Sequence, residues 1–584
     1  MTDFSEHIDD FLAEYFELYP VHATTIGEHA HDGRWPDVTE AGRERRLAFV
    51  SRWLDVLGEL NGLSNDETID RDLLVMELEA ERFSETQLRE VTWNPLEWIY
   101  LLGGGLFPLI AREFAPLAAR LTSVVERLES LPLVVDGAIA ALVGHAGLPV
   151  ARFHTEKAIE QLPGIVELAS DARVAAEAAA PDDAAVAGLL HRLRAAEDVA
   201  RAAMDRFERH LQEVVLPRSE GEGRLGAELF AAKMRHTMRS DELTPERILA
   251  RAEREYAAVR AEMVRLAGEL WPAWCPGRDR PADDGALVRG VLDAVAGEHP
   301  PAADLLDYCR AELGRIEAFC RERNLVGLAD EPLDIRWTPT FLRAFGGAML
   351  DSPGPLDRGE KSFFAITPVP DEWTAEQRES YLREDNDRML RLLTIHEAVP
   401  GHYLQGVYAN RSSSLVRSIF WSGLFAEGWA VYVTQVMMDA GYGADDPALL
   451  LTHWKFYLRS ITNAIIDARI HVHGMTGEEA VSFMVDGGFQ EESEARAKFD
   501  RARLSSTQLS TYFTGSMEFW DIELEARRRA AAASGDPRGA DAVPEPRVVG
   551  GFGETPGFDR RRHLESVISH GSPPTALLRR IVLG

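Results

Sequence analysis

The sequence predicts a mainly α-helical protein with one small β-sheet. Clear helix starts recur along the chain: Thr244 followed by Pro245 is an N-cap with proline at the first helical position, and residues 476–479 (Thr-Gly-Glu-Glu) form a capping box. Between residues 249 and 270 apolar side chains recur at spacings of three and four, as on a helix that packs against other helices. Strand-like runs occur at 332–370.

Taken in order, helical patterns fill most of the chain. The first is amphipathic and ends at Pro20, because proline cannot continue a helix. Helical patterns also dominate residues 40–88 and 112–216. Individual helices are expected at 3–20, 244–270, 302–322, 449–472 and 559–569, and the Ala-, Gly- and Pro-rich residues 530–557 are expected to form a long exposed loop.

The predicted strands cover residues 333–338 and 362–367, with Gly- and Pro-rich connections. They lie just before a helix that carries two histidines. The sheet could therefore offer a free edge to the backbone of a bound peptide. Purely structural strands are the alternative.

Composition indicates a soluble globular chain and excludes several kinds of partner. Of the 584 residues, 45% are hydrophobic, and the formal net charge is −32, which argues against nucleic acid and anionic membranes. Three cysteines are too few for a disulfide framework or a thiolate metal site. Residues 1–6 have neither the basic nor the apolar region of a secretory signal. We therefore expect a cytoplasmic protein with no membrane or nucleic-acid partner.

Residues 395–405 (Ile-His-Glu-Ala-Val-Pro-Gly-His-Tyr-Leu-Gln) carry the strongest chemical signal. His396 and His402 could bind zinc, with Glu397 acting on the metal's water. On a straight helix, residues six apart point about 120° away from each other and lie roughly 9 Å apart along the axis, so they cannot share an ion. Pro400 cannot donate to the carbonyl of His396, and Gly401 supplies backbone freedom. We predict that the helix breaks at Pro400-Gly401; two histidines on a helix surface are the alternative.

A catalytic zinc site needs three protein ligands and one open position. Glu427, 25 residues after His402, lies in an apolar segment with Phe425 and Trp429. An acid is costly to bury there unless it is paired or bound to metal. An exposed glutamate at a helix N-terminus is the alternative.

Two further side chains could stabilise a developing oxyanion. Residues 449–472 carry a polar stripe in which Asp467 and His471 are four apart, so the carboxylate could orient the imidazole and raise its pKa. Such a histidine could donate a proton or a hydrogen bond. A polar seam between helices is the alternative. Tyr512 is a candidate phenol donor, although its local sequence fits a core tyrosine equally well.

Four motifs in order resemble the bacterial domain-of-unknown-function 885 family. They are His-Glu-Ala-x-Pro-Gly-His-x-x-Gln (396–405), Glu-Gly-Trp-Ala-x-Tyr (427–432), Asp-x-x-x-His (467–471) and Gln-x-x-x-Tyr-x-x-Gly (508–515). Residues 20–27 and 571–574 also resemble the family, so the similarity covers essentially the whole chain. Near Tyr512 this chain has Arg503-Leu504 and Thr507 where the family pattern leads us to expect Arg-Tyr and proline.

The family in turn resembles helical zinc metallopeptidases that enclose a deep substrate channel. The resemblance implies a zinc ion held by His396, His402 and Glu427, with Glu397 as general base. It also implies His471 and Tyr512 as oxyanion stabilisers. The gap between the histidines is two residues longer than in the usual zinc motif, and the family shares this difference.

These observations predict a single helical catalytic unit over residues 1–584, which can be divided into an N-terminal helical lobe (1–325) and a catalytic lobe (326–584). The expected activity is zinc-dependent cleavage of peptide bonds in short peptides, with metal-bound water activated by Glu397. One alternative is a metal-dependent amidase on a non-peptide substrate. Another is a non-catalytic helical binding protein, which would have no need for Glu397. The sequence leaves open which end of a peptide is attacked.

Overall fold

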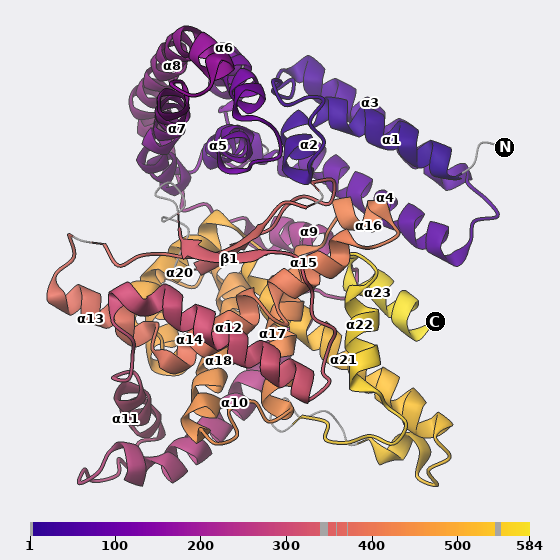
Figure 1. The fold of residues 1–584 in the computed structure, drawn as a ribbon, viewed down its shortest axis with the longest axis vertical. Coiled ribbons are helices and arrows are strands. Elements are labelled where there is room, and N and C mark those ends of the chain that lie inside the picture. Colours follow the sequence, from indigo (N-terminus) through magenta and orange to yellow (C-terminus); the bar gives the residue numbers. More distant parts are fainter. Residues whose placement is uncertain (1–3, 146, 339–347, 358, 371, 544–550) are drawn as a thin grey trace. The chain divides into compact units, whose positions relative to one another are not determined.

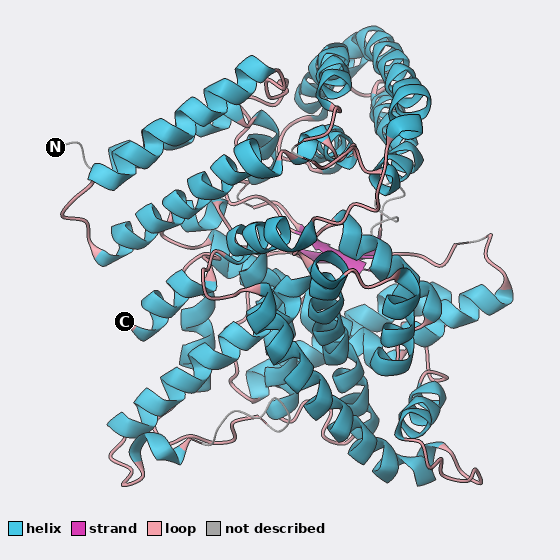
Figure 2. Ribbon diagram, turned by 180° about the vertical axis from the view of Figure 1, so that it is seen from behind, coloured by secondary structure: helices cyan, strands magenta, loops and turns pink. Residues whose placement is uncertain are grey.

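The computed structural model describes residues 4–145, 147–338, 348–357, 359–370, 372–543 and 551–584. Helices make up most of this part of the chain, and one small sheet interrupts them (Figure 2). The predicted fold class, mainly α with a small β-sheet, is confirmed. The deep channel implied by the resemblance stays a prediction. No helix among the described residues is long and apolar enough to cross a membrane.

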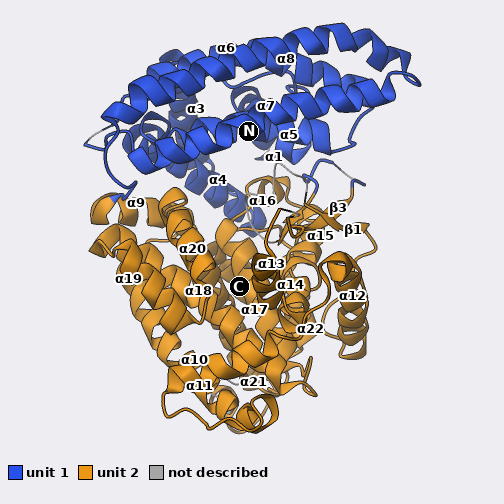
Figure 3. Ribbon diagram, turned by 90° about the vertical axis from the view of Figure 1, so that its left-hand side faces the viewer, with its two compact units in different colours: residues 1–225, 353–360 blue, residues 226–352, 361–584 orange. Residues whose placement is uncertain are grey.

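The chain forms two compact units, coloured separately in Figure 3. Unit 1 comprises Met1–Leu225 together with the short segment Pro353–Glu360. Its helices are α1 (Phe4–Leu18), α2 (Pro20–Ile26), α3 (Glu40–Glu59), α4 (Asn65–Phe83), α5 (Leu96–Ala111), α6 (Leu117–Ala141), α7 (Arg152–Ala179) and α8 (Ala184–His210).

Unit 2 comprises Gly226–Ser352 and Lys361–Gly584. Residues 226–322, which the predicted lobe boundary at 325 assigns to the N-terminal part, belong to this unit, where α10 packs along α18. Its elements (Figure 1) are α9 (Gly226–Met238), α10 (Pro245–Trp274), α11 (Asp284–Val295), α12 (Leu305–Glu322), β1 (Leu333–Trp337), β2 (Ala348–Asp351), β3 (Ser362–Ile366), α13 (Ala375–Glu384), α14 (Asp387–Glu397), α15 (His402–Asn410), α16 (Leu415–Ile419), α17 (Gly423–Asp439), α18 (Pro447–His473), α19 (Gly477–Ser482), α20 (Glu492–Leu504), α21 (Leu509–Ala533), α22 (Arg560–Ile568) and α23 (Thr575–Leu583).

The predicted helix starts are present with the expected caps. The Thr244 side chain accepts a hydrogen bond from the backbone N–H of Arg247 at the start of α10. Thr476 and Glu479 form both bonds of the capping box that opens α19. At the N-terminus α1 ends before Pro20, which becomes the first residue of α2. Local capping chemistry thus fixes where these helices begin.

The sheet is three-stranded in the order β1-β3-β2. β3 lies in the centre, parallel to β1 and antiparallel to β2, and its residues Phe364 and Ile366 are fully buried. These side chains pack in one cluster with Leu390 and Ala398, on and just after α14. The sheet is therefore fixed against the helix that carries His396. The strands β1 and β3 were predicted and β2 was not; residues 339–347, between the predicted strands, lie outside the described part of the chain.

Candidate metal centre

The helix that carries His396 ends between the two histidines, as predicted. α14 ends at Glu397, the backbone of Ala398 has φ −106° and ψ −95°, and α15 begins at His402. The Val399–Pro400 peptide bond is cis. The Gly401 N–H donates to the carbonyl of Ile395 (3.0 Å). A β-carbon on Gly401 would overlap the carbonyl oxygens of Ile395 and His396, so the close return of the chain requires glycine.

The break brings both imidazoles to the carboxylate of Glu427. Nε2 of His402 lies 3.5 Å and Nε2 of His396 4.0 Å from Oε2 of Glu427. The three candidate ligand atoms lie within 4.8 Å of one another, and no other set of three His, Cys, Asp or Glu among the described residues gathers in this way. Tetrahedral zinc with bonds of about 2.1 Å places its ligand atoms about 3.4 Å apart. Small side-chain movements would close the three ligands on one ion.

The protonation states of the cluster also fit a metal. Burial and the charge of His402 lower the pKa of His396 to about 3, so its imidazole is neutral and keeps a lone pair for an ion. Burial alone would lower the pKa of His402 and raise that of Glu427, but their mutual hydrogen bond and attraction reverse both shifts. The proton is therefore held on the His402 imidazole beside an ionised Glu427 carboxylate. A divalent cation would replace that proton, since both ligands bind metal in their deprotonated forms.

Glu397 lies beside the cluster, and its pKa is raised. Burial raises its pKa to about 7; the charge of His402 opposes this shift and that of Glu427 adds to it. The backbone N–H of Leu350, on the edge strand β2, donates a hydrogen bond to it. A carboxyl group with a pKa near neutrality is matched to general-base catalysis.

Glu427 is positioned by an unusually close contact between two helices. A β-carbon on Gly428 of α17 would overlap the backbone of Gly515 on α21, and a β-carbon on Gly515 would overlap the carbonyl of Leu424. The two helix backbones therefore touch at these glycines. On the same turn of α17, Trp429 donates its indole N–H to the carbonyl of Pro400 (2.9 Å). The Glu-Gly-Trp motif thus joins the third ligand to the helix break and to α21.

Tyr512, one turn before Gly515 on α21, is brought to the same carboxylate. Its hydroxyl accepts hydrogen bonds from Arg501 (3.0 Å) and Gln508 (3.4 Å), and it lies close enough to the Glu427 carboxylate for each group to shift the pKa of the other. Burial and the charge of Glu427 raise the pKa of Tyr512 to about 12, so the phenol keeps its proton. The structure therefore joins His396, Glu397, His402, Glu427 and Tyr512 into one site.

His471, the remaining predicted catalytic residue, is not brought to this site. Phe456 on α18 contacts the ring of His396, and His471 lies 15 residues further along the same helix, about 22 Å at 1.5 Å per residue. Its Nε2 bonds the carbonyl oxygen of Ala502 (2.9 Å) and its ring stacks on Phe230. Asp467 accepts hydrogen bonds from Thr507 and Ser510. The predicted oxyanion role of His471 does not fit this position. The polar residues Asp467 and His471 instead connect α18 to α20 and to the start of α21.

Three groups at the site were missed in the sequence. Lys498 and Arg501 on α20 lie close enough to Glu427 for its charge to act on them. Their helix is rich in charged residues, so nothing in its pattern distinguishes them from solvated side chains such as Arg496. The third is the N–H of Leu350, a backbone group in a strand without an alternating pattern. Only the spatial arrangement identifies these three.

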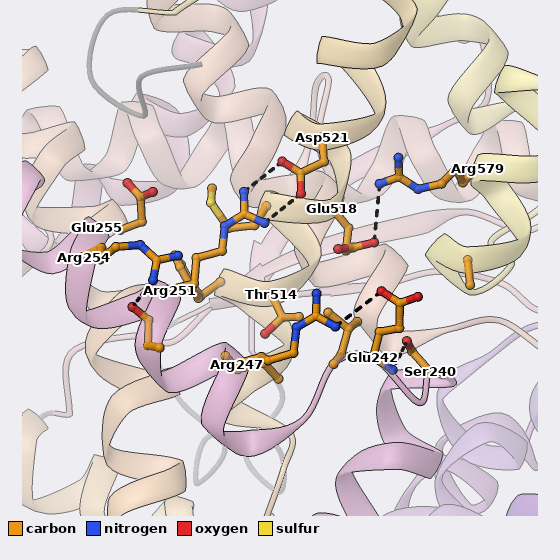
Figure 4. A pocket seen from close by; sticks show the side chains of 16 residues that line it. Ser240, Glu242, Arg247, Arg251, Arg254, Glu255, Thr514, Glu518, Asp521 and Arg579 are labelled. Carbon is orange, nitrogen blue, oxygen red and sulfur yellow. Dashed lines mark hydrogen bonds and ion pairs between the residues drawn. The ribbon is translucent and has the colours of Figure 1, made fainter. Parts of the chain in front are cut away.

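A polar cavity of about 790 Å³ lies elsewhere in unit 2, between α10, α21 and α23 (Figure 4). Its lining arginines are largely neutralised: Arg251 pairs with Asp521 at 2.7 Å, Arg247 with Glu242 at 3.4 Å, and Arg579 with Glu518 at 3.8 Å. None of the metal-centre residues lines this cavity. The histidine–glutamate cluster therefore lies apart from this cavity.

Comparisons with known proteins place the chain in a family. No curated protein matches it. A solved structure from Shewanella oneidensis, described as a "putative lipoprotein of unknown function", is 30% identical, covers both chains completely and has a TM-score of 0.82. A second solved structure, described as "the putative lipoprotein from Colwellia psychrerythraea", has 16% identity and a TM-score of 0.77, covering 100% of this chain and 99% of that chain, and it shows the fold alone. The model of the family described as "Bacterial protein of unknown function (DUF885)" matches residues 20–582. The chain therefore belongs to this DUF885 family.

Proposed function

We propose that the protein is a zinc-dependent hydrolase that cleaves peptide bonds of short peptides, with Glu397 as general base. The observation that carries the proposal is the convergence of two imidazoles and a carboxylate within 4.8 Å, beside a buried glutamate with a raised pKa. Two histidines and one carboxylate are a ligand set of catalytic zinc sites. A metal-binding protein without catalysis would not need the additional acid next to its ligand.

His396, His402 and Glu427 would hold the ion. Zinc bound there would supply an acidified water and a positive charge beside the substrate carbonyl. The ligands come from α14, α15 and α17, so the site depends on the break between the first two helices and on the contact of α17 with α21.

Glu397 would carry out the proton transfers, and Tyr512 would stabilise the developing oxyanion. The Glu397 carboxylate takes a proton from the attacking water and passes it to the nitrogen of the leaving amine. The Tyr512 hydroxyl donates a hydrogen bond to the carbonyl oxygen as negative charge develops on it. The raised pKa of Tyr512 keeps it a donor throughout. Tyr512 alone takes the role that the sequence assigned to it together with His471.

The position of β2 favours a peptide over a non-peptide amide. β2 is an edge strand, and its Leu350 N–H donates to Glu397, so that part of the strand edge faces the site. An extended peptide can pair along such an edge through its own backbone. A metal-dependent amidase on a non-peptide substrate is the second candidate, because the cluster itself would serve both. The cytoplasmic location stays a prediction.

Metal analysis and one variant test this proposal. We expect about one zinc per purified chain, as a single catalytic site requires. Glu397→Gln should keep the metal and lose about 10²- to 10⁴-fold in kcat on a short-peptide library, because general-base catalysis is removed. The matched control is Asp439→Asn, since Asp439 is half-buried and also has a pKa raised by desolvation, to about 6, but lies twelve residues along α17 from Glu427. Unchanged cleavage by Glu397→Gln, or a protein that cannot be loaded with metal, would overturn the proposal.

A further inference from the structure

Two cations on α20 face the candidate site without a carboxylate partner. Lys498 and Arg501 are one turn apart, so they share a face of the helix. Among the described residues, no Asp or Glu oxygen lies within 4 Å of either charged group. Arg501 donates to two neutral oxygens, those of Tyr512 (3.0 Å) and Gln508 (3.1 Å).

Three cations next to this pair, in contrast, are paired with carboxylates. Lys455 bonds Glu384 at 2.9 Å, and Arg459 pairs with Glu384 and Glu494. Arg496, on the solvent side of α20, pairs with Glu492. Burial together with the charges of Arg459 and Arg501 lowers the pKa of Lys498 well below its usual value. Two partly buried cations that repel each other are costly to fold unless an anion joins them.

We propose that Lys498 and Arg501 bind the C-terminal carboxylate of the substrate, which makes the protein a carboxypeptidase. This inference rests on the proposed hydrolase function and specifies its substrate. A guanidinium can hold a carboxylate through two parallel hydrogen bonds, and an ammonium adds a compact charge. An enzyme that cut within a long chain would leave both cations unneutralised.

The geometry also limits how much is removed. Arg501 bonds the Tyr512 hydroxyl at 3.0 Å, and the same hydroxyl would bond the attacked carbonyl oxygen at about 3 Å, which makes a path of about 6 Å. One extended residue spans at most about 3.6 Å. A carboxylate on Arg501 therefore lies one or two residues beyond the carbonyl that is attacked. Water adds across that peptide bond: the carbonyl carbon gains oxygen, the C–N bond breaks, and the proton goes to the released amino acid or dipeptide.

Paired peptides of one sequence, with a free acid or an amide at the C-terminus, test the inference. We expect wild type to cleave the acid with a kcat/KM at least about 30-fold higher, because the amide cannot neutralise the buried cations. Mass spectrometry should show loss of one or two C-terminal residues. Lys498→Gln should lower kcat/KM on the acid by a similar factor and leave the amide unchanged. Arg496→Gln, on the same helix, is the matched control and should behave as wild type.

Lys498 is a better test position than Arg501, because Arg501 also bonds Tyr512 and its loss would disturb the phenol. A binding measurement separates this inference from the proposed function. Calorimetry on Glu397→Gln protein should show tighter binding of an N-acetyl dipeptide acid than of its amide, and Lys498→Gln in that background should abolish the difference.

The outcomes are distinct. Cleavage of acid and amide at equal rates, dependent on Glu397, would keep the hydrolase and overturn the carboxylate site. Preferential binding of the acid without any cleavage would remove the hydrolase and keep the carboxylate site. Equal binding of acid and amide would overturn the inference whatever the activity.

Discussion

Burial raises the pKa of both Glu397 and Tyr512, but it suits the two residues to different roles. It raises the pKa of Glu397 to about 7, where a carboxyl group can both take and release a proton near neutral pH. It raises the pKa of Tyr512 to about 12, where the hydroxyl remains a donor. The charge of Glu427 adds to both shifts. The charge of the Glu427 carboxylate thus helps to divide the roles of base and hydrogen-bond donor.

Tyr512→Phe removes the donor and should leave the ligands in place. We expect kcat on a cleaved peptide to fall by about 10²- to 10³-fold, the usual effect of losing one oxyanion donor, with the zinc content unchanged. Steady-state kinetics and elemental analysis measure both quantities. Tyr408→Phe is the control, because Tyr408 donates to the carbonyl of Gly327 away from the cluster. A wild-type kcat in Tyr512→Phe would exclude Tyr512 from the reaction.

Some of the site residues could be predicted from the sequence. The two histidines, Glu397 and Glu427 could be selected because an acid or imidazole in an apolar segment needs a partner. His471 was misplaced because spacing of four on a helix shows that two side chains share a face, and does not show which helix packs there. Lys498 and Arg501 could not be predicted from the sequence, because α20 carries many charged residues. Only the packing of α20 against the site distinguishes these two from solvated side chains.

At the level of elements, the site depends on the direct contact of α17 with α21. Gly428→Ala should push the two backbones apart, lower the free energy of unfolding by about 1–3 kcal/mol and weaken zinc binding, because Glu427 moves with its helix. Chemical denaturation and metal titration measure these effects. Gly423→Ala is a matched control on the same helix, since a β-carbon there meets no atom within 4 Å. Equal effects of the two substitutions would contradict the role of the contact.

Helices were predicted more fully than strands because their signals are local. The caps at Thr244 and Thr476, and the proline at residue 20, each involve groups within four residues. β2 depends on pairing with residues of β3 that are twelve or more positions away, and its sequence (Ala-Met-Leu-Asp) shows no clear alternation. The helix break was predictable because Pro400 and Gly401 impose it locally. The contact of Gly428 with Gly515 joins residues far apart in sequence, so no local pattern reveals it.

At the scale of the whole molecule, His29 joins the two stretches that make up unit 1. Its Nδ1 bonds Asp32 and its Nε2 bonds Asp357, both at 2.9 Å, and its ring stacks on Phe114. Burial opposes protonation of His29, but the hydrogen bonds and charges of the two aspartates outweigh it and raise the pKa of His29 to about 9. The protonated ring therefore holds the segment Pro353–Glu360 in this unit.

The stabilisation by His29 should depend on pH. Because the pKa is higher in the folded state than in the unfolded chain, the contribution is complete below about pH 6.5 and is lost as pH rises through about 9. After allowance for partial exposure, we expect His29→Ala to cost about 1–2 kcal/mol more at pH 6 than at pH 10. Calorimetric Tm values of both proteins at both pH values measure this. The stacking on Phe114 is lost equally at each pH, so a pH-independent difference would contradict the ion pairs.

The segment Pro353–Glu360 lies in sequence between β2 and β3, yet it belongs to unit 1. The polypeptide therefore passes between the two units three times, at residues 225–226, 352–353 and 360–361. Neither unit is encoded by one uninterrupted stretch of gene. A recombination event that transfers one continuous stretch of this gene cannot carry either unit whole without also carrying part of the other.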